Sequence, residues 1–221
     1  MERRKVFIGI PCYDERMHID LAGVIFQWGK KFDLSIGFAV RAVPLHAARN
    51  IIVKKFLTTD CEYLFFIDDD VIPPQNALEE LIEADKQIIM PATLMLKPIG
   101  PGMTCPVPQC MGNYNPAKKG YRPMWGEGIV EVETIGGAAF LCAREVFTAE
   151  PYKFRFEYYP DGSRRKGADV AFSEDMRARG HKLYAHFDIA CRHVRQCDLL
   201  GVYNTIANLN KEKKDGAVNS S

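Results

Sequence analysis

Apolar runs and amphipathic stretches alternate along most of the chain, which is typical of an α/β domain whose sheet is covered by helices. The runs that predict strands cover 6–10, 34–40, 63–67, 87–90, 129–135, 138–143 and 183–190. Apolar residues at helical spacing predict helices over 14–31, 46–58 and 169–179, and a further helix opening at the proline pair 73–74. The sequence therefore predicts a Rossmann-like mixed sheet flanked by helices, with Asp169 as the N-cap of its helix.

Two segments depart from this pattern. Residues 98–127 are rich in Pro, Gly and Met and show no clear period. We expect a long irregular loop there, of the kind that is usually functional or mobile in a compact domain. Residues 201–221 are mostly polar and end in KEKKDGAVNSS. We therefore expect one domain over 1–200, followed by a flexible tail over 201–221.

Composition narrows the class of protein. The 221 residues are 47% hydrophobic and 26% charged, with a formal net charge of +1, which is ordinary globular composition and excludes disordered and membrane classes. No apolar run approaches the ~18 residues of a membrane span, and the first apolar run is too short for a signal peptide. Seven cysteines without framework spacing fit a reducing compartment. We expect a cytoplasmic protein with no membrane span.

Clusters of cysteine and of basic residues leave two alternatives open. A zinc site is conceivable from cysteines and a histidine that do not form CxxC pairs: Cys105, Cys110, Cys191, His193 and Cys197. Basic runs lie at 3–5, 118–119, 164–166 and 211–214. They are either solvated surface or local contacts for a nucleic acid.

Three consecutive carboxylates, Asp68, Asp69 and Asp70, follow the most apolar run (FFIDDDVIPP). In an extended backbone Asp68 and Asp70 point to one side while Asp69 points away. Ligands of open α/β sheets bind at the carboxyl ends of strands, and two close carboxylates repel unless a cation neutralises them. The pattern predicts a site for Mg²⁺ or Mn²⁺, and such an ion commonly bridges to the phosphates of a substrate. The alternative is a strand that ends in solvated turn acids.

The segment AARNIIVKKFLTTDCEYLFFIDDDVIPP resembles the family-2 glycosyltransferases of the GT-A fold, and the resemblance extends over roughly 4–195. In that family the DxD acids bind the ribose and a metal held by the donor diphosphate. The resemblance implies that Asp68 approaches the ribose, that Asp70 and Asp68 serve the metal, and that Asp69 assists. It places Arg49, of the Ala-Arg-Asn motif, near the donor. Otherwise Arg49 is a helix-surface arginine.

A second segment, GADVAFSEDMRARGHKLYAHFDIACRHV, resembles the helix and strand that complete the active site in the same family. The resemblance implies that Asp169 is the catalytic base and that His193 is a third metal ligand. Ala168 departs from the usual Glu, so one carboxylate of the pair is missing. A competing register would make Glu174 and Asp175 the acidic pair.

The loop PCYDER corresponds to the region where the family cradles the nucleotide base. The resemblance implies contacts from Pro11, Tyr13 and Glu15, and Tyr13 offers a stacking face. The family usually has an Asp-rich turn after its second strand, and GFAVRAVPLH has none. Uridine is expected only from the habit of the family.

Glycines and aromatic residues in the second half suggest further contacts. Gly136 and Gly137 precede an apolar strand, where glycine permits close approach of a ligand or simply forms a turn. Tyr121 and Trp125 beside Arg122 could form a platform for an acceptor or could anchor their loop.

Together these features predict a glycosyltransferase that uses Mn²⁺ or Mg²⁺ and moves a sugar from a nucleotide-sugar donor, UDP-linked by family habit, to an acceptor hydroxyl. The position of the base implies inversion by single displacement. The acceptor is a glycan or a hydroxylated base in nucleic acid, and the oligomeric state is open. The alternatives are a non-catalytic nucleotide-sugar or glycan binder, which Ala168 would suit, and a haloacid-dehalogenase-like phosphatase. A nucleotidyltransferase would need a Gly-rich basic loop after the first strand, which is lacking.

Overall fold

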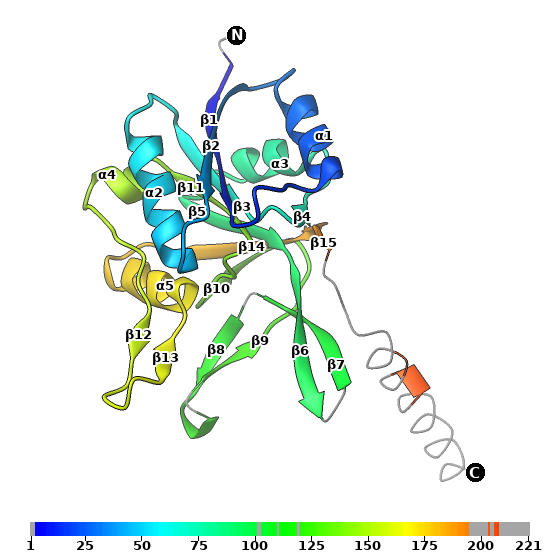
Figure 1. Cartoon of the computed structure of the whole chain (residues 1–221), viewed down its shortest axis with the longest axis vertical. Helices are drawn as coiled ribbons and strands as arrows, with labels where there is room; N and C mark the ends of the chain where they lie inside the picture. Colours follow the sequence, from blue (N-terminus) through cyan, green and yellow to red (C-terminus); the bar gives the residue numbers. More distant parts are fainter. Residues whose placement is uncertain are drawn as a thin grey trace.

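A seven-stranded mixed sheet forms the centre of the computed structural model, which describes residues 3–100, 103–109, 111–118 and 120–194, and positions 203, 206 and 207 (Figure 1). The strand order is β10-β14-β5-β11-β3-β1-β2. The strands are β1 (Lys5–Cys12), β2 (Asp33–Val40), β3 (Tyr63–Ile67), β5 (Ile88–Ala92), β10 (Ile129–Val132), β11 (Ala139–Ala143) and β14 (Leu183–Ala190). The mixed α/β architecture predicted from the sequence is confirmed.

The direction of the strands fixes where a site can form. Strands β1, β2, β3, β5 and β14 run parallel, while β11 and β10 run antiparallel to their neighbours. The carboxyl ends of the five parallel strands therefore meet at one edge, together with the start of β11. This is the edge at which open α/β sheets bind their ligands.

Helices cover both faces of the sheet. The central strand β3 has apolar side chains on both of its faces, and each face must be buried. Leu64 and Phe66 enter one buried cluster, and Phe65 and Ile67 enter the other. The helices are α1 (Ile19–Trp28), α2 (Leu45–Leu57), α3 (Ala77–Glu83), α4 (Glu145–Thr148) and α5 (Ala168–Ala178). Helices α2, α4 and α5 pack on the first cluster, and α1 and α3 on the second.

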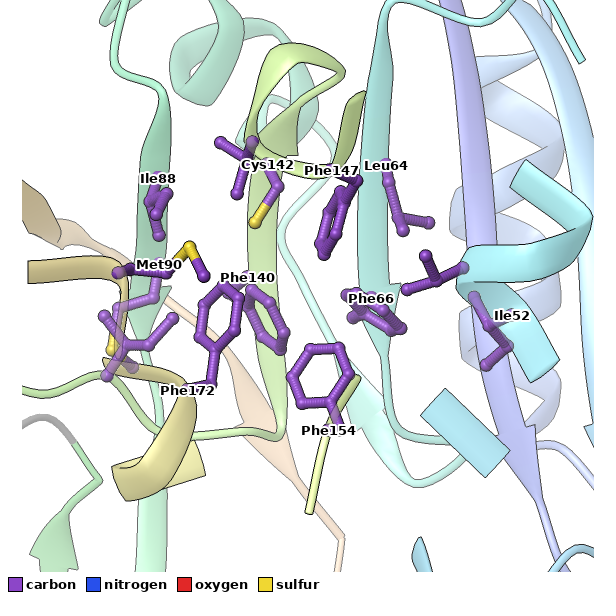
Figure 2. Packing of buried hydrophobic residues seen from close by; sticks show 14 of the residues in the cluster. Ile52, Leu64, Phe66, Ile88, Met90, Phe140, Cys142, Phe147, Phe154 and Phe172 are labelled. Atoms are coloured by element: carbon purple, nitrogen blue, oxygen red, sulfur yellow. The ribbon is translucent and has the colours of Figure 1, made fainter. Parts of the chain in front are cut away.

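Stacked aromatic rings fill the first cluster (Figure 2). The rings of Phe66 and Phe140 lie 4.7 Å apart, and those of Phe154 and Phe172 lie 5.0 Å apart. Phe154 also meets Phe66 edge-on at 5.6 Å. Truncating such a ring typically costs about 3–5 kcal/mol. The cluster therefore holds α5, which carries Phe172, firmly against the sheet.

Two predicted helix starts are corrected. Helix α1 begins at Ile19 instead of residue 14, because the His18 side chain accepts a hydrogen bond from the Asp20 amide at 3.1 Å and caps the helix there. The N-cap of α5 is Gly167. Asp169 is the second residue of the helix and does not cap it.

The expectation of an irregular loop over 98–127 was wrong. Most of this segment pairs in local hairpins, which Figure 1 shows extending with a third hairpin from the same end of the sheet. Register shifts and prolines interrupt the strands, which removes the alternation that would have predicted them. The hairpin strands are β6 (Leu94–Gly100) with β7 (Met103–Pro108), β8 (Met111–Asn115) with β9 (Gly120–Pro123), and β12 (Glu157–Tyr158) with β13 (Arg164–Lys166). A 3₁₀ helix, η1 (Pro116–Lys118), lies between β8 and β9.

A short antiparallel pair joins two distant parts of the chain. Strand β4 (Val71–Ile72) pairs with β15 (Arg192–His193), with His193 opposite Val71. This pair was not predicted, and it brings His193 beside the acid cluster. Nearly all of the predicted tail, 201–221, lies outside the described residues, so the domain boundary stays a prediction. Within the described part of the chain, no helix has the length and apolar character needed to cross a membrane.

Candidate active site

The three aspartates form a turn at the carboxyl edge of the sheet. The Asp68 amide donates to the Ala138 carbonyl at 2.8 Å, and the Val71 amide donates to the Asp68 carbonyl at 3.0 Å. The backbone is thus no longer extended after Ile67, and the alternation assumed from the sequence does not apply. Each of the three aspartate side chains instead has different neighbours.

Asp68 lines a pocket of about 370 Å³ together with Arg49 and Asp169. Three predicted site residues, from a turn and two helices far apart in the sequence, therefore share one cavity. Other lining residues were not predicted: Gln109, Phe156 and Arg164. Arg164 belongs to a basic run that the sequence does not distinguish from solvated surface. In the structure its guanidinium lies over the Phe156 ring, 5.5 Å from the centroid, and both side chains line the pocket. We call this cavity the acid pocket.

Arg49 is buried, with 3% of its surface exposed, so it is not a helix-surface arginine. Its Nη2 donates to the Gly137 carbonyl at 2.8 Å, and its guanidinium lies over the Phe154 ring. A Cβ on Gly137 would lie 2.0 Å from Nη2. A Cβ on Gly136 would lie 2.4 Å from the Cβ of Gln109. Both glycines are therefore required by side chains of this chain, and they hold the wall of the acid pocket.

Asp169 reaches the acid pocket from the first turn of α5. Its Oδ1 accepts a hydrogen bond from the Val170 amide at 3.0 Å, which orients the carboxylate at the positive end of the helix dipole. A Cβ on Gly167 would lie 2.7 Å from this oxygen. Ala168, at the position of the missing Glu, lines the pocket but is 2% exposed.

The carboxylates of the competing register are occupied by partners. Glu174 accepts from the Tyr121 hydroxyl at 2.8 Å and pairs with Lys166. Asp175 pairs with Arg155, and this hydrogen bond is the main cause that lowers the pKa of Asp175. A carboxylate held in this way is a weak base. These contacts favour Asp169 over the alternative pair.

Asp70 faces His193. The distance from Asp70 Oδ1 to His193 Nε2 is 3.3 Å, and the other ring nitrogen, Nδ1, lies 2.7 Å from the Leu94 carbonyl oxygen. A carbonyl can only accept, so Nδ1 carries a proton and Nε2 is directed at the carboxylate. Metal-binding histidines are commonly oriented by such a bond to their second nitrogen. The side chain of His193 is 5% exposed and that of Asp70 is 27% exposed.

Of the three implied metal ligands, the structure places Asp70 and His193 together, while Asp68 lines the acid pocket. Within the described residues, no group of three or more His, Cys, Asp or Glu side chains is arranged to hold a metal ion. Of the zinc alternative, Cys110 and Cys197 lie outside the described residues. Burial raises the pKa of Cys191 to about 12, which disfavours the thiolate that zinc requires.

Asp69 supports the neighbouring loop. Its carbonyl accepts from the His18 amide at 2.9 Å. The Cys12 thiol donates to the Arg16 carbonyl. The pKa of Cys12 is raised mainly by burial and, to a lesser extent, by the nearby Asp69 carboxylate. Asp69 therefore ties the loop after β1 to the acid turn.

That loop forms a second cavity, of about 510 Å³, lined by Tyr13 and Glu15. Tyr13 is 61% exposed. Glu15 pairs with Arg41 at 2.5 Å, and both have positive φ, 57° and 53°. Arg41 occupies the turn after β2 in which the family would have an Asp. Pro11 is buried within β1 opposite Ala39 and does not line the cavity.

Tyr121 and Trp125 do not form one platform. Trp125 packs on the Phe187 ring at 5.7 Å, while Tyr121 lines a cavity that Trp125 does not line. Trp125 is still 56% exposed. It therefore anchors its loop with one face only.

Comparison with known proteins shows the fold. No family model and no curated protein sequence matches the chain. Among solved structures, A197 from STIV is 17% identical with a TM-score of 0.55, over 87% of this chain and 86% of that one. GalNAc-T7 with UDP, GalNAc and Mn²⁺ is 14% identical with a TM-score of 0.55, over 89% of this chain and 44% of that one. S. aureus TarS 1-349 in complex with UDP-GlcNAc is 12% identical with a TM-score of 0.50, over 89% of this chain and 60% of that one.

These likenesses are all remote in sequence, and they define the architecture as a GT-A-like glycosyltransferase fold. The fold implied by the sequence resemblance is confirmed. The chain spans less than two thirds of the length of GalNAc-T7 and TarS.

Proposed function

We propose that the protein is a glycosyltransferase that moves a sugar from a nucleotide-sugar donor to an acceptor hydroxyl. The observation that carries the proposal is the acid pocket, in which Asp68, Arg49 and Asp169 meet at the carboxyl edge of the sheet. Two structures of the same fold contain UDP-GlcNAc or UDP with GalNAc and Mn²⁺, which supports a nucleotide-sugar donor.

The donor would lie along the edge of the sheet. Tyr13 and Glu15 would receive the base, and Asp68 would bind the ribose. The residues fit a divalent cation, because His193 Nε2 is directed at an oxygen of Asp70 while Leu94 fixes the ring. Asp70 and His193 would hold such a Mn²⁺ or Mg²⁺ ion through a carboxylate oxygen and a ring nitrogen. Bound there, the cation supplies charge neutralisation for the leaving diphosphate.

Asp169 would act on the acceptor. Its carboxylate takes the proton of the acceptor hydroxyl as that oxygen bonds to the anomeric carbon, and the bond from this carbon to the diphosphate oxygen breaks with its electron pair. The products are a glycoside, a nucleoside diphosphate and protonated Asp169. Attack from the side opposite the leaving group gives inversion.

One observation favours a second function. Ala168 stands where the family has a Glu, and it is buried under the acid pocket. A protein that binds a nucleotide sugar without transferring it would show the same cavities. Release of nucleoside diphosphate distinguishes the two functions.

The test is a screen of nucleotide sugars with Mn²⁺, measuring donor binding and nucleoside-diphosphate release with and without acceptors. Asp70→Asn should weaken donor binding and release, and Asp169→Asn should abolish transfer but preserve donor binding. Asp85→Asn is a matched control: Asp85 is exposed, lies before β5 at the opposite, amino edge of the sheet, and has φ of 51°, which Asn also adopts readily.

Donor binding without release in the wild type would support the binding protein instead. Release that Asp70→Asn leaves unchanged would refute the proposed role of the acid cluster. Loss of transfer in Asp175→Asn, with Asp169→Asn active, would move the base to the alternative register.

A further inference from the structure

A third cavity adjoins the acid pocket at the first turn of α5. It measures about 570 Å³ and is lined by Tyr114, Tyr121, Tyr159, Arg165, Lys166 and Glu174. Gly167 and Val170, which flank Asp169 in the chain, line both cavities. A ligand that extends from this cavity, which we call the tyrosine pocket, into the acid pocket would therefore reach Asp169.

The floor of the tyrosine pocket is held by hydrogen bonds and ion pairs. The Tyr121 hydroxyl donates to Glu174 at 2.8 Å, and Lys166 lies between Glu174 and Glu157. The Tyr114 ring meets the Tyr121 ring at 5.3 Å and 67°. These contacts fix the aromatic rings before any ligand binds, which reduces the entropy cost of binding.

Two of the lining tyrosines are about half exposed to solvent. Tyr114 is 48% exposed and Tyr159 is 50% exposed. Tyr159 is held by the turn of its hairpin, where its amide donates to the Ser163 carbonyl at 2.8 Å and its carbonyl accepts from the Gly162 amide at 2.9 Å. Gly162 has φ of 82°, a conformation that suits glycine. The two tyrosines therefore come from separate hairpins, β8–β9 and β12–β13, and face one cavity.

We propose that the tyrosine pocket is the acceptor subsite and that the acceptor is a carbohydrate chain whose terminal hydroxyl reaches Asp169. This rests on the proposed function. The negative face of an aromatic ring attracts the C–H groups on the apolar face of a sugar ring. Glu174 and Lys166 supply the few polar groups that orient a ligand in an otherwise aromatic cavity, and the volume is that of a small-ligand site.

The charge of the pocket favours a carbohydrate over a nucleic acid. Lys166 is already paired with two carboxylates. Among the cations that line the pocket, this leaves Arg165, for which no ion pair occurs within the described residues. Nucleic acids are held by several cations that track the phosphates. A pocket with one such cation and a carboxylate at its floor suits a ligand of hydroxyl groups.

The experiment measures ligand binding by the full chain on an array of neutral and acidic oligosaccharides and to a short single-stranded DNA. The glycan that binds best is then titrated by calorimetry against Tyr114→Ala and Tyr159→Ala. Tyr158→Ala is the matched control, because Tyr158 lies on the same hairpin, is 57% exposed and does not line the pocket. Tyr114→Phe and Tyr159→Phe keep the aromatic face.

We expect both alanine variants to weaken glycan binding at least about tenfold, and the control and phenylalanine variants to bind within about twofold of the wild type. Thermal unfolding checks that each variant is folded. The proposal is overturned if no glycan binds, if the alanine variants bind normally, or if DNA binds through the same tyrosines.

Donor hydrolysis without acceptor separates this proposal from the proposed function. If donor hydrolysis depends on Asp70 but glycan affinity is unchanged in the tyrosine-to-alanine variants, the acceptor subsite alone is overturned. Glycan binding that depends on the tyrosines, without any hydrolysis, supports the subsite and overturns the transferase.

Discussion

Gly137→Ala would place a methyl group where the guanidinium of Arg49 lies. The added Cβ would be 2.0 Å from Nη2 and 2.7 Å from Cζ. Arg49 cannot simply move away, since it is 3% exposed and bonded to the Gly137 carbonyl at 2.8 Å. The backbone of Gly137 has no positive φ, so the clash and not backbone strain should decide the cost.

The magnitude follows from two contributions. Overpacking in a buried site costs about 1–3 kcal/mol. Displacing Arg49 also weakens a hydrogen bond from a charged group, which contributes about 1.5–3 kcal/mol. We therefore expect Gly137→Ala to lower the free energy of unfolding by about 2.5–6 kcal/mol. In an Arg49→Ala background the methyl group has room, and its cost should fall below about 1 kcal/mol.

The assay is urea unfolding of the wild type, both single variants and the double variant. Gly23→Ala is the control: Gly23 lies in α1 with no atom within 4 Å of an added Cβ, so this change should stabilise the protein by about 0.5–1 kcal/mol. An equal cost of Gly137→Ala in both backgrounds would refute the explanation by the Arg49 clash.

Three further predictions concern other contacts. Asp175→Asn should cost about 1–2 kcal/mol at neutral pH, because it loses the pair with Arg155. The pKa of Asp175 is lowered in the folded state, so this contribution is complete above its unfolded pKa of about 3.9 and is lost as pH falls through the folded pKa. Unfolding measured from pH 7 to pH 3 should show the gap between variant and wild type closing only below about pH 4; a constant gap would contradict this. His193→Gln should raise the Mn²⁺ concentration for half-maximal donor hydrolysis at least about tenfold, and an unchanged titration would exclude His193 as a ligand. Trp28→Phe removes the indole hydrogen bond to the Gln75 carbonyl at 2.7 Å and leaves a small void, so thermal unfolding should show a loss of about 1–3 kcal/mol; a loss below about 0.5 kcal/mol would show the bond to be unimportant.

The sequence predicted the central strand well because the reason for its burial is local. YLFFI is apolar at every position, and the structure buries Leu64 and Phe66 on one face and Phe65 and Ile67 on the other. A strand with no polar face has no alternative but the centre of a covered sheet. The same run also predicted where the acid cluster would lie, at the carboxyl edge.

The hairpins and the short pair β4–β15 could not be predicted in this way. Two-residue strands have no period, and Val71 and His193 are far apart in the sequence. Yet this pair is what brings the His193 side chain beside Asp70. The resemblance to a family suggested the two residues, but only the tertiary structure supplies their distance and the Leu94 carbonyl that orients the ring.

By itself, the sequence determined the α/β class, the acid turn at a strand end and the helix that carries Asp169, because apolar periodicity and short motifs are local properties. The family resemblance implied Asp169 as the base, with Glu174 and Asp175 as a competing register. The tertiary structure supports Asp169 through the partners of the other two: Asp175 and Glu174 pair with Arg155 and Lys166, while Asp169 enters a pocket with Asp68. Those partners come from a separate hairpin and the segment leading into it, so charge neutralisation there depends on long-range packing that no local pattern encodes.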